Sequence, residues 1–361
     1  MASALLKNIE RSGKQVLIKL IRVLFPKLKQ VDAAEIDRSG IKKVLVIRME
    51  QKLGNLVMTT FFPRAIKDLF PNAEIDLLVH VSLKDIWDHN PFVNKLHLFS
   101  HNVHLKSPLK MLRLLKDIRR DRYDMVFDCS TPAGFSLSNS LLVHVTKADY
   151  RAGFKKGDSS RFLNLTVPPD HTNHYIEMNH DLLRLFDPGL RKYRPELYID
   201  ENYQQKAAEY LKNAGVDDSG QLVLLWVGAR YNKQWKLNNF VETALAMGLL
   251  YGNAIFLCGP EEKEHFRDLS EKFKKQTIFV TDFRLLAALI EKCRLFVSGD
   301  AGPLHLAYAL RKKTVGIYME DNYTVYGYDN GSKNRIVDLS DEPDNYKKVI
   351  DICRGVFDHR E

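Results

Sequence analysis

The chain has 361 residues, of which 45% are hydrophobic and 27% are charged. This length is sufficient for two domains with separate cores, and the composition excludes a disordered chain. The formal net charge of +9 is unevenly distributed, because residues 1–30 carry seven basic groups and one acid, Glu10. The remainder has an excess of only about +3, so a uniformly basic surface for nucleic acid does not fit this sequence.

The N-terminal 40 residues are predicted to form a basic extension that begins with an amphipathic helix. Its apolar positions follow a spacing of three and four residues, and Pro26 interrupts them; they are Leu6, Ile9, Gly13, Val16, Leu17, Leu20, Ile21, Leu24 and Leu28. We favour an anchor for residues 1–30 on the cytoplasmic surface of the inner membrane, with the cations on anionic headgroups. The alternative is a helix packed on the protein's own core or on another subunit.

Two features concern the cellular location. No apolar run approaches the roughly 20 residues that span a bilayer, and the N-terminus lacks the apolar block of a secretory signal. The cysteines are far apart and form no CxxC pair; they are Cys129, Cys258, Cys293 and Cys353. They are therefore predicted to be buried, reduced thiols. We accordingly expect a cytoplasmic protein that is peripheral on the membrane.

From residue 42 onward, short β-branched runs alternate with helical patterns, which predicts an α/β fold with parallel sheets. The expected strands of the first half are Lys43–Ile47, Ile75–Val79, Leu96–Phe99 and Met125–Asp128, with helices near Leu56–Phe70 and Pro108–Arg122. The expected strands of the second half are Leu222–Val227, Ala254–Cys258, Thr277–Val280, Leu295–Ser298 and Thr314–Tyr318. A Pro- and Gly-bearing linker at 187–200 separates domains at 41–187 and 188–342, and a helix within 343–361 is expected to pack back on the first domain.

Three loops that follow predicted strands carry candidate functional residues. Ser298–Ala307 reads S-G-D-A-G-P-L-H-L-A, in which two glycines precede a helix that starts near Pro303. Free amides at a helix start favour a phosphate or pyrophosphate. Asp300 is expected to brace the loop or to orient a sugar hydroxyl or a lysine, and His305 to contact a phosphate or cap the loop. A purely structural turn is the alternative, and the loop matches neither a Walker nor a GxGxxG motif.

The other two loops supply cations and a carboxylate. Val227–Lys236 gathers Arg230, Lys233 and Lys236 around Trp235, which suits a diphosphate leaving group or, alternatively, a solvated loop that Trp235 holds to the domain. The loop after the first strand carries Glu50 as its carboxylate, and Gly54 permits a close turn into the next helix.

Taken together, these loops resemble the bacterial heptosyltransferase family, glycosyltransferase family 9, which uses ADP-heptose in lipopolysaccharide core synthesis. The shared motifs are R-x-E-x-x-L-G-N (Arg48 to Asn55) before Thr59 and Thr60, F-P-x-A-x-I-D-x-L-V (Phe70 to Val79), K-x-W (Lys233 to Trp235), G-P-E-E-x-E (Gly259 to Glu264) and Ser298–Ala307. The resemblance implies a GT-B architecture, in which two Rossmann-like domains face a cleft, with the acceptor mainly on the first and the nucleotide sugar mainly on the second. It also implies inverting transfer without a metal or cofactor.

One residue departs from the family pattern. Many members have L-G-D in the first loop, where the aspartate is regarded as the base, whereas this chain has Asn55. An amide takes no proton at neutral pH, so we expect Glu50 to be the base. The predicted catalytic residues are Glu50, Asn55 and Lys233. The predicted donor-binding residues are Gly54, Lys233, Asp300, Ala301, Gly302, Pro303, Leu304 and His305. The predicted acceptor-binding residues are Thr59, Lys106, Lys110, Arg113 and Arg120.

The function that these residues predict is inverting transfer of a sugar, most readily heptose from ADP-heptose, onto an anionic glycolipid such as a lipopolysaccharide core. The base would deprotonate the acceptor hydroxyl while Lys233 stabilises the departing diphosphate. The basic segment that holds Lys110 and Arg113 is read either as a contact with acceptor phosphates or as a solvated helix face. A non-catalytic sugar-nucleotide-binding or scaffold protein that lost its base is the rival interpretation, and a protein or other glycan as acceptor is a third.

Overall fold

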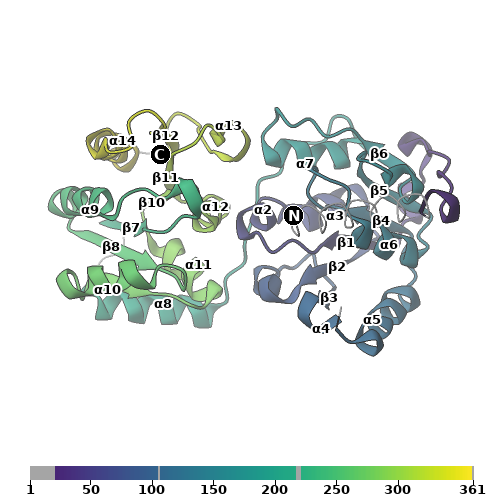
Figure 1. Cartoon of the computed structure of the whole chain (residues 1–361), viewed down its shortest axis with the longest axis horizontal. Helices are drawn as coiled ribbons and strands as arrows, with labels where there is room; N and C mark the ends of the chain where they lie inside the picture. The colour runs from purple at the N-terminus through teal and green to yellow at the C-terminus, as the bar shows by residue number, and fades with distance from the viewer. Residues whose placement is uncertain (1–20, 105, 217–220, 360–361) are drawn as a thin grey trace, which may run out of the picture.

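The computed structural model describes residues 21–104, 106–216 and 221–359. They form two lobes that lie side by side (Figure 1), each built on a parallel sheet with helices on both faces. The strands of the first sheet are β1 (Lys43–Arg48), β2 (Glu74–His80), β3 (Lys95–Phe99), β4 (Met125–Asp128), β5 (Tyr150–Phe154) and β6 (Leu165–Val167). Those of the second are β7 (Leu222–Trp226), β8 (Asn253–Cys258), β9 (Thr277–Phe279), β10 (Leu295–Gly299), β11 (Lys313–Tyr318) and β12 (Asn334–Asp338).

The two sheets have the same topology. Their orders are β3-β2-β1-β4-β5-β6 and β12-β11-β10-β7-β8-β9, so in both domains the first and fourth strands are neighbours at the centre. This is the strand order of the Rossmann fold. The expected α/β class and the pair of Rossmann-like domains of the GT-B architecture are therefore confirmed. β5, β6 and β12 were not predicted.

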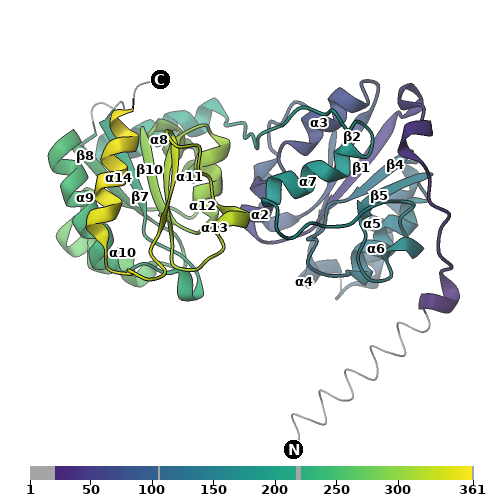
Figure 2. The ribbon, with the colours of Figure 1, turned by 90° about the horizontal axis from the view of Figure 1, so that it is seen from above.

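The helices cover both faces of the sheets (Figure 2). In the first domain they are α2 (Leu53–Val57), α3 (Phe62–Leu69), α4 (His101–His104), α5 (Pro108–Arg120), α6 (Leu137–Thr146) and α7 (Tyr175–Arg184). In the second they are α8 (Glu201–Asn213), α9 (Leu237–Tyr251), α10 (Lys263–Lys272), α11 (Phe283–Lys292), α12 (Gly302–Ala309), α13 (Tyr323–Tyr326) and α14 (Tyr346–Asp358). Short 3-10 helices occupy Ala33–Glu35, Arg38–Gly40, Val81–Ile86, Ser159–Arg161 and Tyr231–Lys233.

Two helical predictions need correction. The single helix expected near Leu56–Phe70 is divided into α2 and α3, since Pro63 starts a new helix. The last helix, α14, packs on α9, β11 and β12 of the second domain and not back on the first. Its apolar stripe of Val349, Cys353 and Val356 belongs to the core of the second domain.

The N-terminal prediction lies largely outside the described residues, because their first residue is 21. Ile21 is buried, whereas Val23 and Leu24 are exposed. After this short helical end the chain is extended, with the amide of Leu28 donating to the carbonyl of Ser160 and that of Val31 to the carbonyl of Asn164. The expected helix therefore stops before Pro26. None of the helices in the described ranges is long and apolar enough to cross a membrane.

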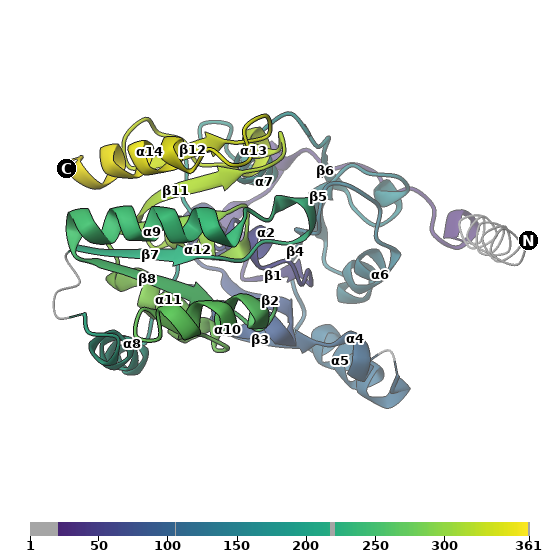
Figure 3. The ribbon, with the colours of Figure 1, turned by 60° about the vertical axis from the view of Figure 1, so that its left-hand side comes forward.

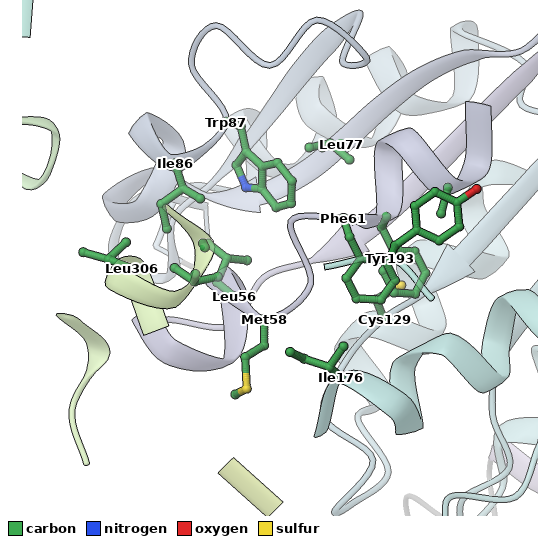
Figure 4. Packing of buried hydrophobic residues seen from close by; sticks show 14 of the residues in the cluster. Leu56, Met58, Phe61, Leu77, Ile86, Trp87, Cys129, Ile176, Tyr193 and Leu306 are labelled. Atoms are coloured by element: carbon green, nitrogen blue, oxygen red, sulfur yellow. The ribbon is translucent and has the colours of Figure 1, made fainter. Parts of the chain in front are cut away.

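The two domains share one continuous hydrophobic cluster. Leu306 of α12 reaches across the boundary and lies near Leu56 of α2 and Ile86 of the first domain (Figure 4). Residues 185–200 connect α7 to α8 without a helix or strand. The four cysteines are buried and free, as predicted. The domains thus meet through a packed apolar contact, which fixes how the loops of one face those of the other.

Candidate active site

The predicted loops lie at the point where strand order reverses in each sheet. This point falls between β1 and β4 in the first sheet and between β7 and β10 in the second. In open α/β sheets, ligands bind at the carboxyl ends of the strands at this place. The loops after β1, β7 and β10 carry Glu50, Lys233 and Asp300, respectively. The topology therefore puts all three loops where a ligand is expected.

A buried arginine orients the carboxylate of the first domain. Arg48, the last residue of β1, places Nη2 2.7 Å from Oε2 of Glu50. The same guanidinium donates to the carbonyl of Asn55 at 3.1 Å and to the hydroxyl of Tyr175 at 2.7 Å. The side-chain amide of Asn55 lies 3.4 Å from Oε1 of Glu50. The two residues that were singled out from the first loop are thus in contact, and Arg48 holds the acid in place.

In the second domain, Asp300 holds the predicted cation. Nζ of Lys233 forms an ion pair with Oδ2 of Asp300, and the side-chain amide of Asn322 donates to the same oxygen at 2.9 Å. Trp235 is buried, and its indole N–H donates to the carbonyl of Pro343 at 2.7 Å. Trp235 therefore fixes the loop to its domain while Asp300 orients the lysine, which is one of the roles predicted for that aspartate.

His305 is enclosed between the domains. It is buried, and its Nδ1 lies 2.6 Å from the hydroxyl of Tyr328. Burial lowers the pKa of His305 to about 4, so the imidazole is neutral at physiological pH. In this structure the residue braces the interface, and a phosphate contact would require the domains to separate locally.

Glycines permit the close approach of α2 and α12, which lie side by side in Figures 1 and 2. A Cβ added at Gly54 would lie 2.5 Å from Cδ2 of His305, and one at Gly302 would lie 2.7 Å from Cδ2 of Leu53. A glycine in each helix therefore leaves room for a side chain of the other helix. Gly54, predicted as a donor-binding residue, functions here as a contact between the domains.

We expect Gly54→Ala to loosen the domain contact. The added methyl overlaps a buried ring, and such overpacking costs about 1–3 kcal/mol, which exceeds the gain of up to ~1 kcal/mol from the higher helix propensity of alanine. The thermal midpoint should fall, and the radius of gyration from small-angle scattering should rise. Gly355→Ala on α14 is the matched control, because a Cβ there meets nothing within 4 Å. That variant should be stabilised, and equal behaviour of the two variants would contradict the assigned contact.

The stability of the domain contact should depend on pH through His305. Its folded pKa of about 4 lies below the unfolded value of roughly 6.5, so the unfolded state binds more protons between these values. The stabilisation is complete above pH 6.5 and is lost as the pH falls toward 4, by roughly 3 kcal/mol in total. Burial also lowers the pKa of other histidines, such as His97 and His180. The measurement is therefore the difference between wild type and His305→Gln in thermal midpoint at pH 7 and pH 5. A constant difference would exclude this origin.

An aromatic cluster that was not predicted spans the two domains. The ring of Tyr326, on α13, lies 5.9 Å from that of Tyr175 on α7 and 6.0 Å from Nζ of Lys233. The ring of Tyr328 lies 5.6 Å from that of His174. The sequence signal was the aromatic run Y-T-V-Y-G-Y at 323–328. Tyr326 therefore stands between the Arg48–Glu50 pair and the Lys233–Asp300 pair.

A buried lysine was also missed. Nζ of Lys156 donates to Oγ of Ser130 and to the carbonyl of Thr131, both at 2.7 Å. It follows β5, which was not predicted, and it shapes the loop after β4. Burial lowers the pKa of Lys156, while Asp128 opposes the shift.

The predicted acceptor residues do not form one site. Thr59 is buried and its hydroxyl donates to the carbonyl of Leu56 at 2.7 Å, so the structure does not support an acceptor contact there. Lys110, Arg113 and Arg120 line an open groove of about 440 Å³ between α5 and β3. Lys106 is exposed just before α5. These cations are separate from the loops of Glu50 and Lys233.

One side-chain group in the described ranges has a geometry that suits a metal ion, namely Asp76, His97 and Asp121. The hydroxyl of Tyr123 donates to Asp76 at 2.7 Å, and Nζ of Lys95 donates to Asp121 at 2.5 Å. Asp76 is the third residue of β2 and His97 is the middle residue of β3, whereas Glu50 follows the carboxyl end of β1. The cluster is therefore a neutralised polar network away from the candidate active site.

Comparison with known proteins gives consistent matches. Residues 111–349 match the family described as glycosyltransferase family 9 (heptosyltransferase). The chain is 24% identical over 276 residues to lipopolysaccharide heptosyltransferase 3 of Escherichia coli K12, covering 73% of this chain and 79% of that protein. It resembles the solved family 9 glycosyltransferase of Veillonella parvula with a TM-score of 0.73 and 19% identity, covering 89% and 90% of the two chains. It also resembles the E. coli heptosyltransferase WaaC with ADP-2-deoxy-2-fluoro heptose with a TM-score of 0.65 and 18% identity, covering 86% and 99%.

Proposed function

Because the chain belongs to glycosyltransferase family 9, the heptosyltransferase family, we propose that it transfers heptose from ADP-heptose, with inversion, onto a lipopolysaccharide core or a related glycan. It is a glycosyltransferase by this membership. The observation that carries the proposed transfer is that Tyr175 and Tyr326 connect the Arg48–Glu50 pair of one domain to Lys233 of the other. The similarity to lipopolysaccharide heptosyltransferase 3 and to the WaaC structure with ADP-2-deoxy-2-fluoro heptose supports the choice of sugar and nucleotide.

The proposed reaction is one displacement at the anomeric carbon. The acceptor oxygen forms a bond to this carbon as the bond to the diphosphate oxygen breaks, and the electron pair leaves with the nucleoside diphosphate. Glu50 takes the hydroxyl proton, for which Arg48 and Asn55 hold it in position. Lys233 neutralises the leaving group, and a closed cleft would exclude water that hydrolyses the donor.

Not all of the predicted donor-binding residues have a backbone amide that is available to the diphosphate. The amide of Leu304 already donates to the carbonyl of Ala301 at 3.0 Å, and Pro303 has no amide hydrogen. We therefore propose that the amides of Ala301 and Gly302, at the start of α12, meet the diphosphate. Asp300 would act through Lys233 and not on the phosphates themselves.

Three further parts of the proposal concern partners. The acceptor is an anionic glycolipid, residues 1–30 attach the protein to the cytoplasmic surface of the inner membrane, and neither a metal nor a cofactor is required. Of this apolar N-terminal face, Leu24 is exposed within the described residues, whereas Ile21 is buried. A chelator should accordingly leave the rate of transfer unchanged, and no nucleic acid should compete with the acceptor.

The deciding experiment incubates the full chain with a panel of nucleotide sugars and with detergent-solubilised lipopolysaccharide cores. Mass spectrometry should detect the gain of one heptose on the acceptor with ADP-heptose, and NMR should show the opposite anomeric configuration. Transfer of another sugar would overturn the donor assignment. Donor binding without either transfer or hydrolysis would instead support the scaffold interpretation.

A further inference from the structure

The surface of α5 combines exposed leucines with unpaired cations. Leu109 and Leu112, one turn apart, are 79% and 61% exposed. Leu114 and Ile118, on the opposite side of this helix, are buried in the core of the first domain. Both leucines are mostly open to solvent, and exposed apolar side chains that form a patch rimmed by polar residues mark an interaction surface.

The charges on the same helix favour an anionic partner. The cations are Lys110, Arg113, Lys116, Arg119 and Arg120, whereas Asp117 is the acid of this helix. Asp117 pairs with Arg120, and within the described part of the chain Lys110, Arg113 and Lys116 make no ion pair. Leucines beside free cations on one helix face are typical of a helix that lies in a membrane interface.

We propose that α5 docks on the surface of an anionic phospholipid bilayer, with Leu109 and Leu112 inserted and its cations on headgroup phosphates. Lys110 and Arg113, together with Lys95, line the open groove of about 440 Å³ beside the helix. This concentration of cations supports binding to an anionic surface. A glycan acceptor alone would leave the two leucines unexplained. This contact is separate from residues 1–30 and from the site of transfer.

The fold relates this surface to the active site. α5 returns the chain from the carboxyl end of β3 to the amino end of β4. Its first turn therefore lies near the carboxyl ends of the strands, as Glu50 does. In Figure 3, α5 lies on the part of the molecule that is remote from the second domain. Docking through α5 would therefore hold the first domain at the bilayer and leave the second free to exchange nucleotide.

A single tryptophan can report on this contact. Trp87, Trp226 and Trp235 are all buried, so Leu112→Trp adds an exposed indole. With vesicles of phosphatidylglycerol and phosphatidylcholine that contain no glycolipid, its emission should shift to the blue and lose most of its intensity to brominated acyl chains. The matched control is Leu249→Trp on α9, where Leu249 is 89% exposed but the helix carries no lysine or arginine. This control should show neither change.

A charge-reversal variant tests whether the cations of α5 contribute to membrane binding. Each cation near the surface contributes about a fivefold gain in affinity, so Lys110→Glu/Arg113→Glu/Lys116→Glu should weaken vesicle binding by more than about 100-fold. Lys272→Glu/Lys274→Glu/Lys275→Glu makes the same charge change on the second domain and should have a much smaller effect. Transfer to a water-soluble, deacylated acceptor should be unchanged in Leu112→Trp, because Leu112 is not one of the predicted acceptor-binding residues.

Four results would overturn the proposal. They are absence of vesicle binding, a Leu112→Trp signal that lipid leaves unchanged, equal quenching at positions 112 and 249, and binding that requires glycolipid in the vesicle. The last result would assign α5 to the acceptor instead. Since the vesicle measurement uses neither donor nor acceptor, its failure is distinguishable from a failure of the proposed transfer reaction.

Discussion

Glu50→Gln is expected to lower kcat by about 10²- to 10⁴-fold, because a positioned general base contributes this much to proton transfer. The substitution preserves the shape of the side chain but removes its capacity to take the acceptor proton. Donor affinity should change little, since Glu50 belongs to the first domain and the proposed diphosphate contacts belong to the second. Product formation with ADP-heptose and a glycolipid acceptor is the measurement, with donor binding measured by calorimetry alongside.

Two controls separate chemistry from folding. Glu50→Gln removes the counter-charge of the buried Arg48, so the thermal midpoint of the variant must be measured as well. The second control returns a carboxylate to the neighbouring position as Glu50→Gln/Asn55→Asp, since the amide of Asn55 lies 3.4 Å from Oε1 of Glu50. This double variant should recover part of the lost rate without a change in donor affinity. Full turnover by Glu50→Gln alone would remove Glu50 from the mechanism.

The fold was predictable from the sequence where a strand is buried on both faces. β1, β4, β7 and β10 are continuous apolar runs, and each was expected to within one residue at either end. β5, β6 and β12 were missed because they lie toward the sheet edges, where polar side chains interrupt the pattern, as in Tyr150–Phe154 and Asn334–Asp338. The domain against which α14 packs was predicted wrongly, because an apolar stripe shows that a helix is buried but does not show which domain covers it.

The candidate site was predictable at the level of loops and less so at the level of contacts. The strand–loop–helix pattern located Glu50, Lys233 and Asp300, because parallel strands present their carboxyl ends at one edge. Pairings such as Lys233 with Asp300 or His305 with Tyr328 depend on residues more than 20 positions apart. Periodicity carries no such information.

Lys233→Met is expected to have the second large effect, a fall in kcat of about 10²- to 10³-fold. Negative charge develops on the diphosphate as its bond to the sugar breaks, and the lysine neutralises more charge in that transition state than in the bound donor. The donor Kd should therefore rise by less than about tenfold, in line with the small contribution of a partly exposed ion pair. Single-turnover rates at saturating donor, together with calorimetric Kd values, resolve the two effects.

Asp300→Asn is the informative companion, because it keeps the lysine but removes the charge that orients it. In the wild type Asp300 accepts from both Lys233 and Asn322, so the variant should leave the ammonium in place with a less defined position. We expect a smaller loss of kcat than for Lys233→Met, and little further loss when the two substitutions are combined, since both act through the same ammonium. Additive losses would mean that Asp300 contacts the substrate directly, and an unchanged kcat in Lys233→Met would assign the leaving-group role to another cation.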